Sequence, residues 1–532
     1  MRRGMPHPGT IAAATIAALV VVALGGLVAA GGDFSDLAGR APYLVAIVAS
    51  ATRQAALSTL ASLLLGTALA LALERRARFP GRSLLVALIG TATVAPTIVV
   101  VFGLIAVYGR AGPVQAALAA LGLPPLPPIY GLSGILLAHV AMNAPFVARV
   151  MLGALGRVPD EQLRLATALR FGVLDTLRHC DGPVIRREAP ALAAFVFLLC
   201  FTSFAVVLSL GGGPANATLE VAIYEALRID VDFARAAMLA GLQIVLGLGF
   251  VGALGLAGVS LPEATGAERP HPRPDGDNRA LKLVDAGVIT LAVAAMAPPV
   301  LGVIGGVAHL PVLADAEIGR ALATSLALAA LAALVCVVLA VLMAASAYRT
   351  TDGRPAPRRG RAMDLASLAI LGLPPYAFVA GLYVVLRRFA DPETIGLMLV
   401  PLVNALMALP FAYRLIAPAV ALGAARHGRL AASLRIAGLD RLRLVDAPLL
   451  RGPVLAAAGM AAALSLGDFG VIALFGGGDL VTLPYVLADR MGAYRMNEAA
   501  AIALVMVGLA AGLGLAAERL ARAPGEARNG ST

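Results

Sequence analysis

The chain contains twelve apolar stretches of about 20 residues, and this recurring length constrains its fold more than any other feature. A helix needs roughly 20 apolar residues to cross the ~30 Å hydrocarbon core of a bilayer. With 60% hydrophobic and 14% charged residues, the 532-residue chain is too apolar for a soluble protein. We therefore predict an all-α integral membrane protein with about 12 transmembrane helices. The expected spans are 10–30, 54–74, 84–107, 131–151, 189–211, 236–258, 285–308, 321–347, 365–386, 396–417, 454–475 and 498–518.

The arginines indicate which ends of these spans face the cytoplasm. Basic residues concentrate in alternate connections such as "ERRARFPGR" and "YRTTDGRPAPRRGR", whereas "GDFSDLAG" and "LPVLADAEIG" contain none. Short cytoplasmic loops carry an excess of Lys and Arg, so both termini are predicted to lie in the cytoplasm. The first apolar run follows Arg2 and Arg3 but is too long for an ordinary signal-peptide core, so we expect a retained helix.

An arginine-rich segment occurs twice. "RLATALRFGVLDTLRHCDGPVIR" begins at Arg164 and "RLAASLRIAGLDRLRLVDAPLLR" begins at Arg429, 265 residues later, with about half of the positions identical. Because an even number of expected spans separates the copies, both face the same side of the membrane, and the two six-helix halves are predicted to be parallel repeats. The predicted ranges are 1–258 for the first repeat with its coupling loop at 157–188, 259–284 for a Pro- and Arg-rich cytoplasmic linker, and 285–532 for the second repeat with its coupling loop at 422–453.

Each copy is too long for a tight connection between helices, so we expect it to have structure of its own. In the first copy a Pro and acidic residues precede Leu163, Ala166 and Leu169, which follow one another at helical spacing. A turn near Gly172 is expected to lead to a second short helix that Asp181-Gly-Pro183 stops. An amphipathic loop lying on lipid headgroups is the alternative, but the same Asp, Arg and Pro pattern in both copies favours docking to a symmetric, two-headed partner.

The repeated segments resemble the coupling segment of permease subunits in binding-protein-dependent ABC importers. That segment carries Glu-Ala-Ala, a Gly shortly afterwards and a Pro further on. This chain has the Pro at the matching spacing, but it has Arg-Leu-Ala in place of Glu-Ala-Ala and an Arg in place of the Gly, so the nearby Gly172 and Gly438 are expected to provide the turn. The resemblance implies ATPase contacts at Arg164, Leu165, Ala166, Arg170, Asp175, Arg178, Asp181, Pro183, Arg429, Leu430, Ala431, Arg435, Asp440, Arg443, Asp446 and Pro448.

The last two expected spans of each half resemble one group of these permeases in particular. "SFAVVLSLGGGPANATLEVAIYEALR" from Ser203 and "SLGDFGVIALFGGGDLVTLPYVLADRMGAYRMNEAA" from Ser465 are similar to the duplicated permease of the thiamine and thiamine diphosphate ABC importer. The resemblance implies a fold like that of type I importer permeases in the bacterial inner membrane. It also implies two copies of a cytoplasmic ATP-binding cassette ATPase and a periplasmic thiamine-binding protein as partners. The permease of the iron(III) importer, which is also duplicated, is the alternative.

The chain has no ATP-binding loop of its own. A Walker A loop needs a lysine that reaches the phosphates, and the single lysine, Lys282, follows Arg-Ala-Leu instead of the glycine-rich pattern. We therefore predict a transport subunit and not an enzyme. Cys180, Cys200 and Cys336 lack metal-binding spacing, and the basic residues lack interleaved aromatic ones, so we expect no metal, no cofactor and no nucleic acid, with membrane lipid as the surrounding partner.

Polar residues at membrane depth mark the predicted translocation path, because an ionisable group inside a span is costly and usually functional. Asp468 corresponds to Ser203 in the other copy, and Phe469 corresponds to Phe204. A carboxylate beside phenyl rings suits the positively charged thiazolium ring of thiamine. These four residues are the candidates, and capping of a broken helix or pairing with an arginine are the other interpretations of Asp468. An ion-coupled carrier or channel would need several charges paired across spans, whereas Asp468 is nearly alone.

Proline and glycine recur at one spacing in the third and ninth expected spans. Pro96 precedes Gly103, and Pro374 precedes Gly381, by seven residues each. We interpret the prolines as kinks and the glycines as points of close helix packing. The stretches "GGGPANATLE" and "GGGDLVTLP" follow the fifth span of each half on the outer side, where they are either docking loops for the binding protein or plain loops.

Overall fold

The computed structural model is built from helices, and the residues that it describes contain no strand. The described residues are 8–31, 39, 41–76, 78–92, 95–256, 273–276, 278–348, 357–434, 436, 438–475 and 480–521. The elements of the first predicted half are α1 Pro8–Gly31, α2 Ala41–Arg75, α3 Arg82–Ala92, α4 Thr97–Tyr108, α5 Pro113–Ala120, α6 Leu132–Leu155, α7 Asp160–Ala168, α8 Val173–Thr176, η1 Leu177–Asp181, α9 Gly182–Phe201, α10 Ala205–Leu210, η2 Pro214–Asn216, α11 Leu219–Arg228 and α12 Phe233–Leu256.

The second predicted half follows after the predicted linker 259–284, of which residues 259–272 and 277 lie outside the described residues. Its elements are α13 Arg279–Ile304, η3 Gly305–Ala314, α14 Ala316–Tyr348, α15 Pro357–Ala369, η4 Ile370–Gly372, α16 Pro375–Leu386, α17 Pro392–Ser433, α18 Gly438–Arg441, η5 Leu442–Asp446, α19 Ala447–Leu466, α20 Ile472–Phe475, α21 Leu483–Gly492 and α22 Met496–Ala521. Both η1 and η5 are π-helical turns, whereas the other η elements are 3₁₀ helices.

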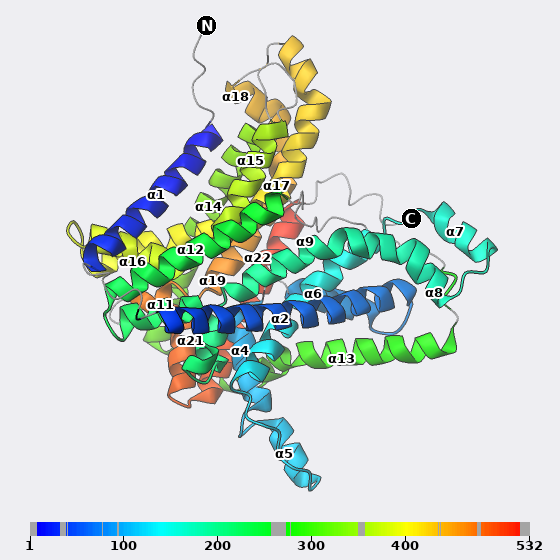
Figure 1. The fold of residues 1–532 in the computed structure, drawn as a ribbon, viewed down its shortest axis with the longest axis horizontal. Helices are drawn as coiled ribbons and strands as arrows, with labels where there is room; N and C mark the ends of the chain where they lie inside the picture. Colours follow the sequence, from blue (N-terminus) through cyan, green and yellow to red (C-terminus); the bar gives the residue numbers. More distant parts are fainter. Residues whose placement is uncertain are drawn as a thin grey trace.

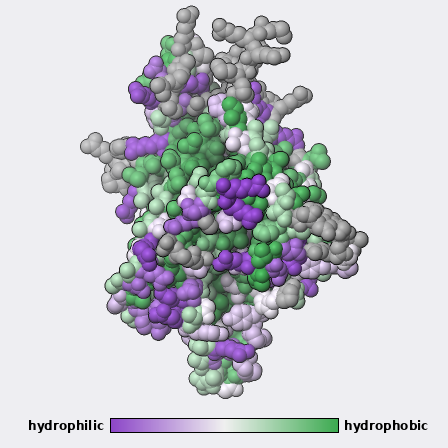
Figure 2. All heavy atoms as spheres, turned by 90° about the vertical axis from the view of Figure 1, so that its left-hand side faces the viewer, coloured by the Kyte–Doolittle hydropathy of each residue, from purple (hydrophilic) through white to green (hydrophobic). Residues whose placement is uncertain are grey.

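Ten helices in the described part of the chain are long and apolar enough to cross a membrane, and each overlaps a predicted span. The other two predicted spans, 189–211 and 365–386, fall on interrupted helices, α9 followed by α10 and α15 followed by α16. Large apolar side chains are exposed along α1, α2, α13 and α14, and Figure 2 shows a face where apolar side chains cover broad areas between hydrophilic patches. A surface of this kind suits lipid and not water. The multi-pass character is confirmed, and the count of twelve spans stays a prediction.

The helix breaks before α4 and before α16 coincide with the two prolines named in the sequence analysis. Pro96 and Pro374 are the N-caps of α4 and α16. Because proline has no N–H and disfavours helical geometry in the residue before it, each ends the preceding helix and allows a new one to begin. The prolines therefore break the predicted third and ninth spans instead of kinking continuous helices.

The first helix of each predicted half packs against the other half. Helix α1 contacts α14 and α16, and α13 contacts α2 and α4. At both contacts a glycine allows the backbones to meet: a Cβ on Gly381 would lie 1.9 Å from the carbonyl oxygen of Ala23, and a Cβ on Gly103 would lie 2.4 Å from Cα of Pro299. The predicted close packing at these two glycines is confirmed. Because the first helix of each half packs against helices of the other half, these contacts hold the two halves together.

Two groups of helices diverge from the middle of the molecule (Figure 1). Helices α2, α6, α9 and α13 run toward α7 and α8 at the right of the view, whereas α14, α15 and α17 rise toward α18 at the top. The N–H of Gly9 donates to Oγ of Ser346 at 2.7 Å, so the start of α1 meets the end of α14. The two repeated segments thus occupy the free ends of the two groups.

Candidate functional site: coupling segments and central cavity

The first coupling segment turns away from α6 and then returns into α9. Pro159 is the N-cap of α7, and Gly172 is the N-cap of α8. The π-helical turn η1 then continues directly into α9, whose first turn contains Gly182 and Pro183. The predicted stop at Asp181-Gly-Pro183 is therefore wrong.

The second coupling segment has the same order of elements after a different beginning. Helix α17 continues to Ser433 without interruption, and Ala424 stands where the first copy has Pro159. From there α18, η5 and α19 follow as α8, η1 and α9 do in the first segment. Of the predicted contact residues here, Arg435 lies outside the described residues.

The turn after α7 is made by Arg170 and not by Gly172, which corrects the sequence-based expectation. Arg170 has φ +55°, in the left-handed region that favours glycine. The N–H of Phe171 donates to the carbonyl of Ala166 at 2.9 Å, the bond that closes a helix end of this type. In the second segment the N–H of Ile436 donates to the carbonyl of Ala431 at 2.9 Å. The backbone at Arg170 is therefore left-handed, which explains why the family motif has a glycine at this position.

Matched leucines are exposed in the two segments. Leu165 is 60% exposed beside Ala166 at 2%, and Leu430 is 59% exposed beside Ala431 at 3%. Leu169 and Leu434, one turn further on, are exposed as well. Residues four apart on a helix share a face, so each segment presents a pair of leucines outward while its alanine packs inward. An exposed apolar ridge of this kind is typical of a protein-binding surface.

The charged residues of the two segments also correspond. Asp175, Arg178, Asp440 and Arg443 are exposed, and so are Arg164, Pro183 and Pro448. The carboxylate of Asp175 accepts the N–H of Gly172 at 3.2 Å and caps α8. Asp181 and Asp446, in contrast, are both buried.

Asp181 is bound by a residue of the predicted linker. Nη1 of Arg273 lies 3.1 Å from Oδ1 of Asp181, and Nη2 lies 2.6 Å from Oδ2. Arg273 also donates to Asp275 at 3.1 Å, and the exposed fractions of the three side chains are 2% or less. Burial lowers the pKa of Arg273, but hydrogen bonds and charges from the two aspartates outweigh it and raise the pKa above its usual value. The Oδ2 of Asp446 lies 3.8 Å from Nε of Arg441.

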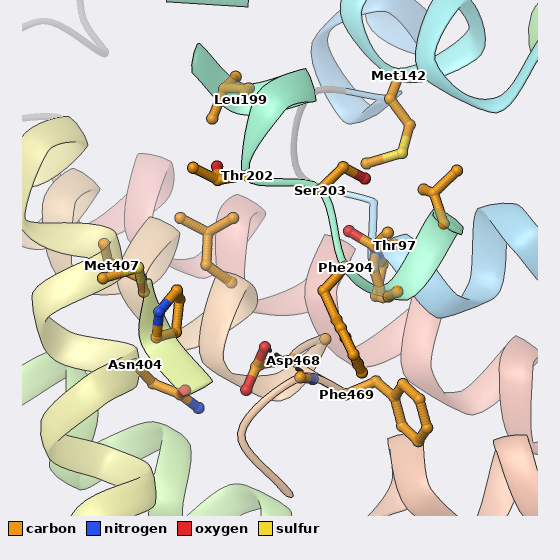
Figure 3. Close-up of a pocket in the computed structure, with 18 of the residues that line it drawn as sticks. Thr97, Met142, Leu199, Thr202, Ser203, Phe204, Asn404, Met407, Asp468 and Phe469 are labelled. Carbon is orange, nitrogen blue, oxygen red and sulfur yellow. Dashed lines mark hydrogen bonds between the residues drawn. The ribbon is translucent and has the colours of Figure 1, made fainter. Parts of the chain in front are cut away.

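A cavity of about 350 Å³ lies where the two helix groups meet. Ser203, Phe204, Asp468 and Phe469, the four predicted path residues, all line it. In Figure 3 Asp468 lies among the labelled side chains, with Phe204 and Phe469 on one side and Asn404 and Met407 on the other. The structure therefore brings together residues from two segments that are 265 positions apart.

Asp468 both caps a helix and lines the cavity. Its Oδ1 accepts the N–H of Gly470 at 3.1 Å and its Oδ2 accepts the N–H of Val471 at 3.2 Å, at the start of α20. The ring centroids of Phe204 and Phe469 lie 6.4 Å apart beside it. Each carboxylate oxygen retains a second lone pair for a ligand. The capping interpretation of Asp468 is thus confirmed, and it is compatible with a role in the path.

Ser203 belongs to a buried polar chain. Its Oγ lies 2.9 Å from Nε2 of His139, whose Nδ1 lies 2.8 Å from Oγ of Ser58. Asn404, which stands at the position corresponding to His139, donates to Oγ of Ser465 at 2.9 Å. These hydrogen bonds give Ser203, His139 and Asn404 partners at the cavity wall and hold their orientation.

Two functional candidates were missed by the sequence analysis, Glu220 and Tyr376, which both line the cavity. Glu220 belongs to a stretch interpreted there as an outer loop, but α11 packs against α12 and α16. A carboxylate within "TLEVAIYEAL" was the available signal. Among the lining residues there is no Lys or Arg, and the described residues hold no group of three metal-ligating side chains.

Comparison with known proteins gives one consistent group of relatives. The chain is 41% identical over 530 residues to the thiamine transport system permease protein ThiP of Brucella suis, covering 98% of this chain and 96% of the relative. It is 40% identical to ThiP of Escherichia coli K12, covering 87% of each. It is 33% identical to ThiP of Haemophilus influenzae, covering 87% of this chain and 86% of the relative. No protein-family model matches the chain.

Proposed function

Because the chain belongs to the family of thiamine transport system permeases, we propose that it is the permease subunit of an ABC importer. It receives thiamine from a periplasmic binding protein and passes it to the cytoplasm, while separate ATPase subunits hydrolyse ATP. The observation that carries this proposal is the single cavity lined by a carboxylate and phenyl rings from two distant segments. A cation with aromatic rings fits such a lining, because aromatic faces and a carboxylate both attract positive charge.

The two coupling segments supply the proposed contact with the ATPases. Each presents a pair of outward leucines and an Asp–Arg pair, at the free ends of diverging helix groups. Two copies of one ATPase would bind these matched surfaces, and closure of the ATPase dimer would bring the groups together. Alternating access then follows from a two-state rigid-body movement of packed elements.

The proposed architecture is two parallel six-helix repeats with the coupling segments and both termini in the cytoplasm. The reciprocal packing of α1 on α16 and of α13 on α4 supports the duplication, because the contact glycines Gly381 and Gly103 correspond. The contact of Gly9 with Ser346 supports the orientation, since it puts the start of α1 beside the arginine-rich connection after α14.

Uptake by reconstituted vesicles tests the substrate. Vesicles that contain the permease, its ATPase and its binding protein are expected to accumulate labelled thiamine with ATP inside, and not iron(III). Asp468→Asn removes the charge while keeping the shape of the side chain, and we expect it to lower thiamine uptake and transport-coupled ATP hydrolysis at least about tenfold. Unchanged uptake and hydrolysis in this variant would contradict the proposed path. Uptake of iron(III) and not of thiamine by the unmodified importer would show that iron(III) is the substrate.

Co-purification tests the coupling segments. The ATPase is expected to stay bound to the unmodified permease and to dissociate when Asp175, Arg178, Asp440 and Arg443 are all changed to Ala. The control replaces another Asp–Arg pair outside the coupling segments, Asp230 in the connection after α11 and Arg235 in the first turn of α12. Equal loss of the ATPase from both variants, or from neither, would count against the proposed contact surface.

A further inference from the structure

A second acidic group faces the cavity, from the first predicted half. Glu220 is fully buried on α11 and lines the same cavity as Asp468. Its Oε1 accepts a hydrogen bond from Nε2 of Gln243 at 2.6 Å. Its Oε2 accepts no hydrogen bond of regular geometry from the described residues, and the backbone N–H of Tyr376 is the donor that approaches the carboxylate. A buried oxygen in this state is costly unless a ligand satisfies it.

Tyr376 offers a second unsatisfied polar group at the same wall. Its side chain is 1% exposed, and its hydroxyl has no hydrogen-bond partner among the described residues. The hydroxyl lies close to Asp468, because its oxygen and Oδ1 of Asp468 are each 3.1 Å from the point that a Cβ on Gly470 would occupy. The absence of a side chain at Gly470 therefore keeps the space between these two oxygens open.

Aromatic rings connect the two acidic groups. Tyr224 lies one helical turn after Glu220 on α11 and so shares its face. Its ring centroid is 5.8 Å from that of Tyr376 and 5.3 Å from that of Phe204. The rings of Phe204 and Tyr376 are 4.1 Å apart, and Phe469 continues the row beside Asp468. The rings of Phe204, Tyr376 and Phe469 line the same cavity as Glu220 and Asp468 and form its aromatic wall, and Tyr224 packs on this wall without lining the cavity. The cavity volume of about 350 Å³ is in the range of small-molecule sites.

We propose that Glu220 and Tyr376 bind the aminopyrimidine ring of thiamine while Asp468 balances the charge of its thiazolium ring. This inference rests on the proposed function and assigns the two rings of the substrate to the two ends of the aromatic wall. The exocyclic amine of the pyrimidine donates a hydrogen bond to Oε2 of Glu220. The hydroxyl of Tyr376, which lies on the side of the ring toward Asp468, donates to the ring nitrogen next to the amine, and this nitrogen carries a proton in oxythiamine and cannot accept there. Both groups that the free protein leaves unsatisfied are then used.

Oxythiamine tests this assignment, because it carries an oxygen in place of the exocyclic amine and leaves the thiazolium unchanged. Uptake of labelled thiamine and labelled oxythiamine is measured in the same reconstituted vesicles, with the complete importer. For Glu220→Gln we expect thiamine uptake to fall about tenfold and the ratio of thiamine to oxythiamine uptake to fall by a similar factor, since an amide can donate to the oxygen of the analogue. The binding protein is the same throughout, so its own preference cancels between variants.

Glu225→Gln is the matched control, because Glu225 lies on the same helix and does not line the cavity. Tyr376→Phe keeps the ring packing, removes only the hydroxyl, and is expected to lower the same ratio. An unchanged ratio in both Glu220→Gln and Tyr376→Phe, equal losses for both substrates, or the same effect from Glu225→Gln would overturn the assignment. Absence of thiamine uptake by the unmodified importer would instead reject the proposed function.

Discussion

Arg273 and Asp181, 92 residues apart in the chain, form a buried two-point ion pair that ties the end of the predicted linker to the first coupling segment. The residues after Arg273 are held as well, since Arg76 donates to the carbonyl of Gly276 and to Asp285. The first coupling segment is thus anchored from outside its own stretch of sequence.

Replacement of Arg273 by Ala is expected to loosen the first coupling segment. Removing one partner of a buried ion pair costs about 3–5 kcal/mol, because the remaining charge stays buried. Cys180, which is buried next to Asp181, should then react faster with a maleimide, and the unfolding midpoint of the purified protein should fall. Labelling is measured by mass spectrometry of the peptide that contains Cys180.

The pH dependence of the same reaction provides a further check. Burial and the negative charge of Asp181 raise the pKa of the Cys180 thiol, whereas the positive charge of Arg273 lowers it. Faster labelling in Arg273→Ala would therefore report greater exposure of the thiol and not a lower pKa. Since the thiolate is the reactive form, labelling of the unmodified protein should be slow at neutral pH and should increase as the pH rises. The control for Arg273→Ala is Arg279→Ala, which removes an arginine at the exposed start of α13. If Cys180 is labelled no faster in Arg273→Ala than in this control, the ion pair does not hold the segment.

Arg170→Gly is expected to stabilise the protein. A left-handed backbone costs a residue with a Cβ about 1–2 kcal/mol, and glycine removes this cost while adding some flexibility to the unfolded chain. We expect the free energy of local unfolding of the first coupling segment to rise by about 1 kcal/mol, as measured by hydrogen exchange of its backbone amides. Arg164→Gly, inside α7, should instead destabilise by about 1 kcal/mol. Destabilisation by both substitutions would contradict the interpretation of Arg170.

Gly26→Ala is expected to destabilise the contact between α1 and α16. A Cβ at Gly26 would lie 2.6 Å from the carbonyl oxygen of Gly381, whereas a Cβ at Gly25 would meet nothing within 4 Å. Forcing extra volume into packed helices costs about 1–3 kcal/mol. The thermal midpoint in detergent should therefore fall for Gly26→Ala and stay unchanged for Gly25→Ala, and equal effects would show that the helices do not meet here.

Features with a local physical cause could be predicted from the sequence. Apolar runs of spanning length became helices because the lipid leaves few alternatives. Pro96 and Pro374 were recognised as points of irregular helix, but they end helices instead of kinking them. The meeting of Phe204 with Phe469 at the cavity followed from their equivalent places in the two copies. The glycines Gly103 and Gly381 became packing points for the same reason.

Features that depend on distant partners could not be predicted in this way. No local sequence pattern indicates that Arg273 pairs with Asp181, because the two residues are distant in the sequence and each resembles an ordinary surface charge. Glu220 was missed because a short helix after a glycine-rich stretch has the same composition as an outer loop. The left-handed geometry of Arg170 was hidden because the residue type that normally marks such a turn is absent there.

Cysteine accessibility tests the orientation on which the proposed function depends. Single cysteines replacing Leu165 and Leu430 are expected to react with a membrane-impermeant maleimide only after the cells are opened, since both leucines are exposed on the coupling segments. A cysteine replacing Leu123, which is exposed just after α5, should react in intact cells. The native cysteines Cys180, Cys200 and Cys336 are buried, so they contribute little background. Labelling of one coupling segment from outside would place the two copies on opposite faces, where a single ATPase dimer could not bind both.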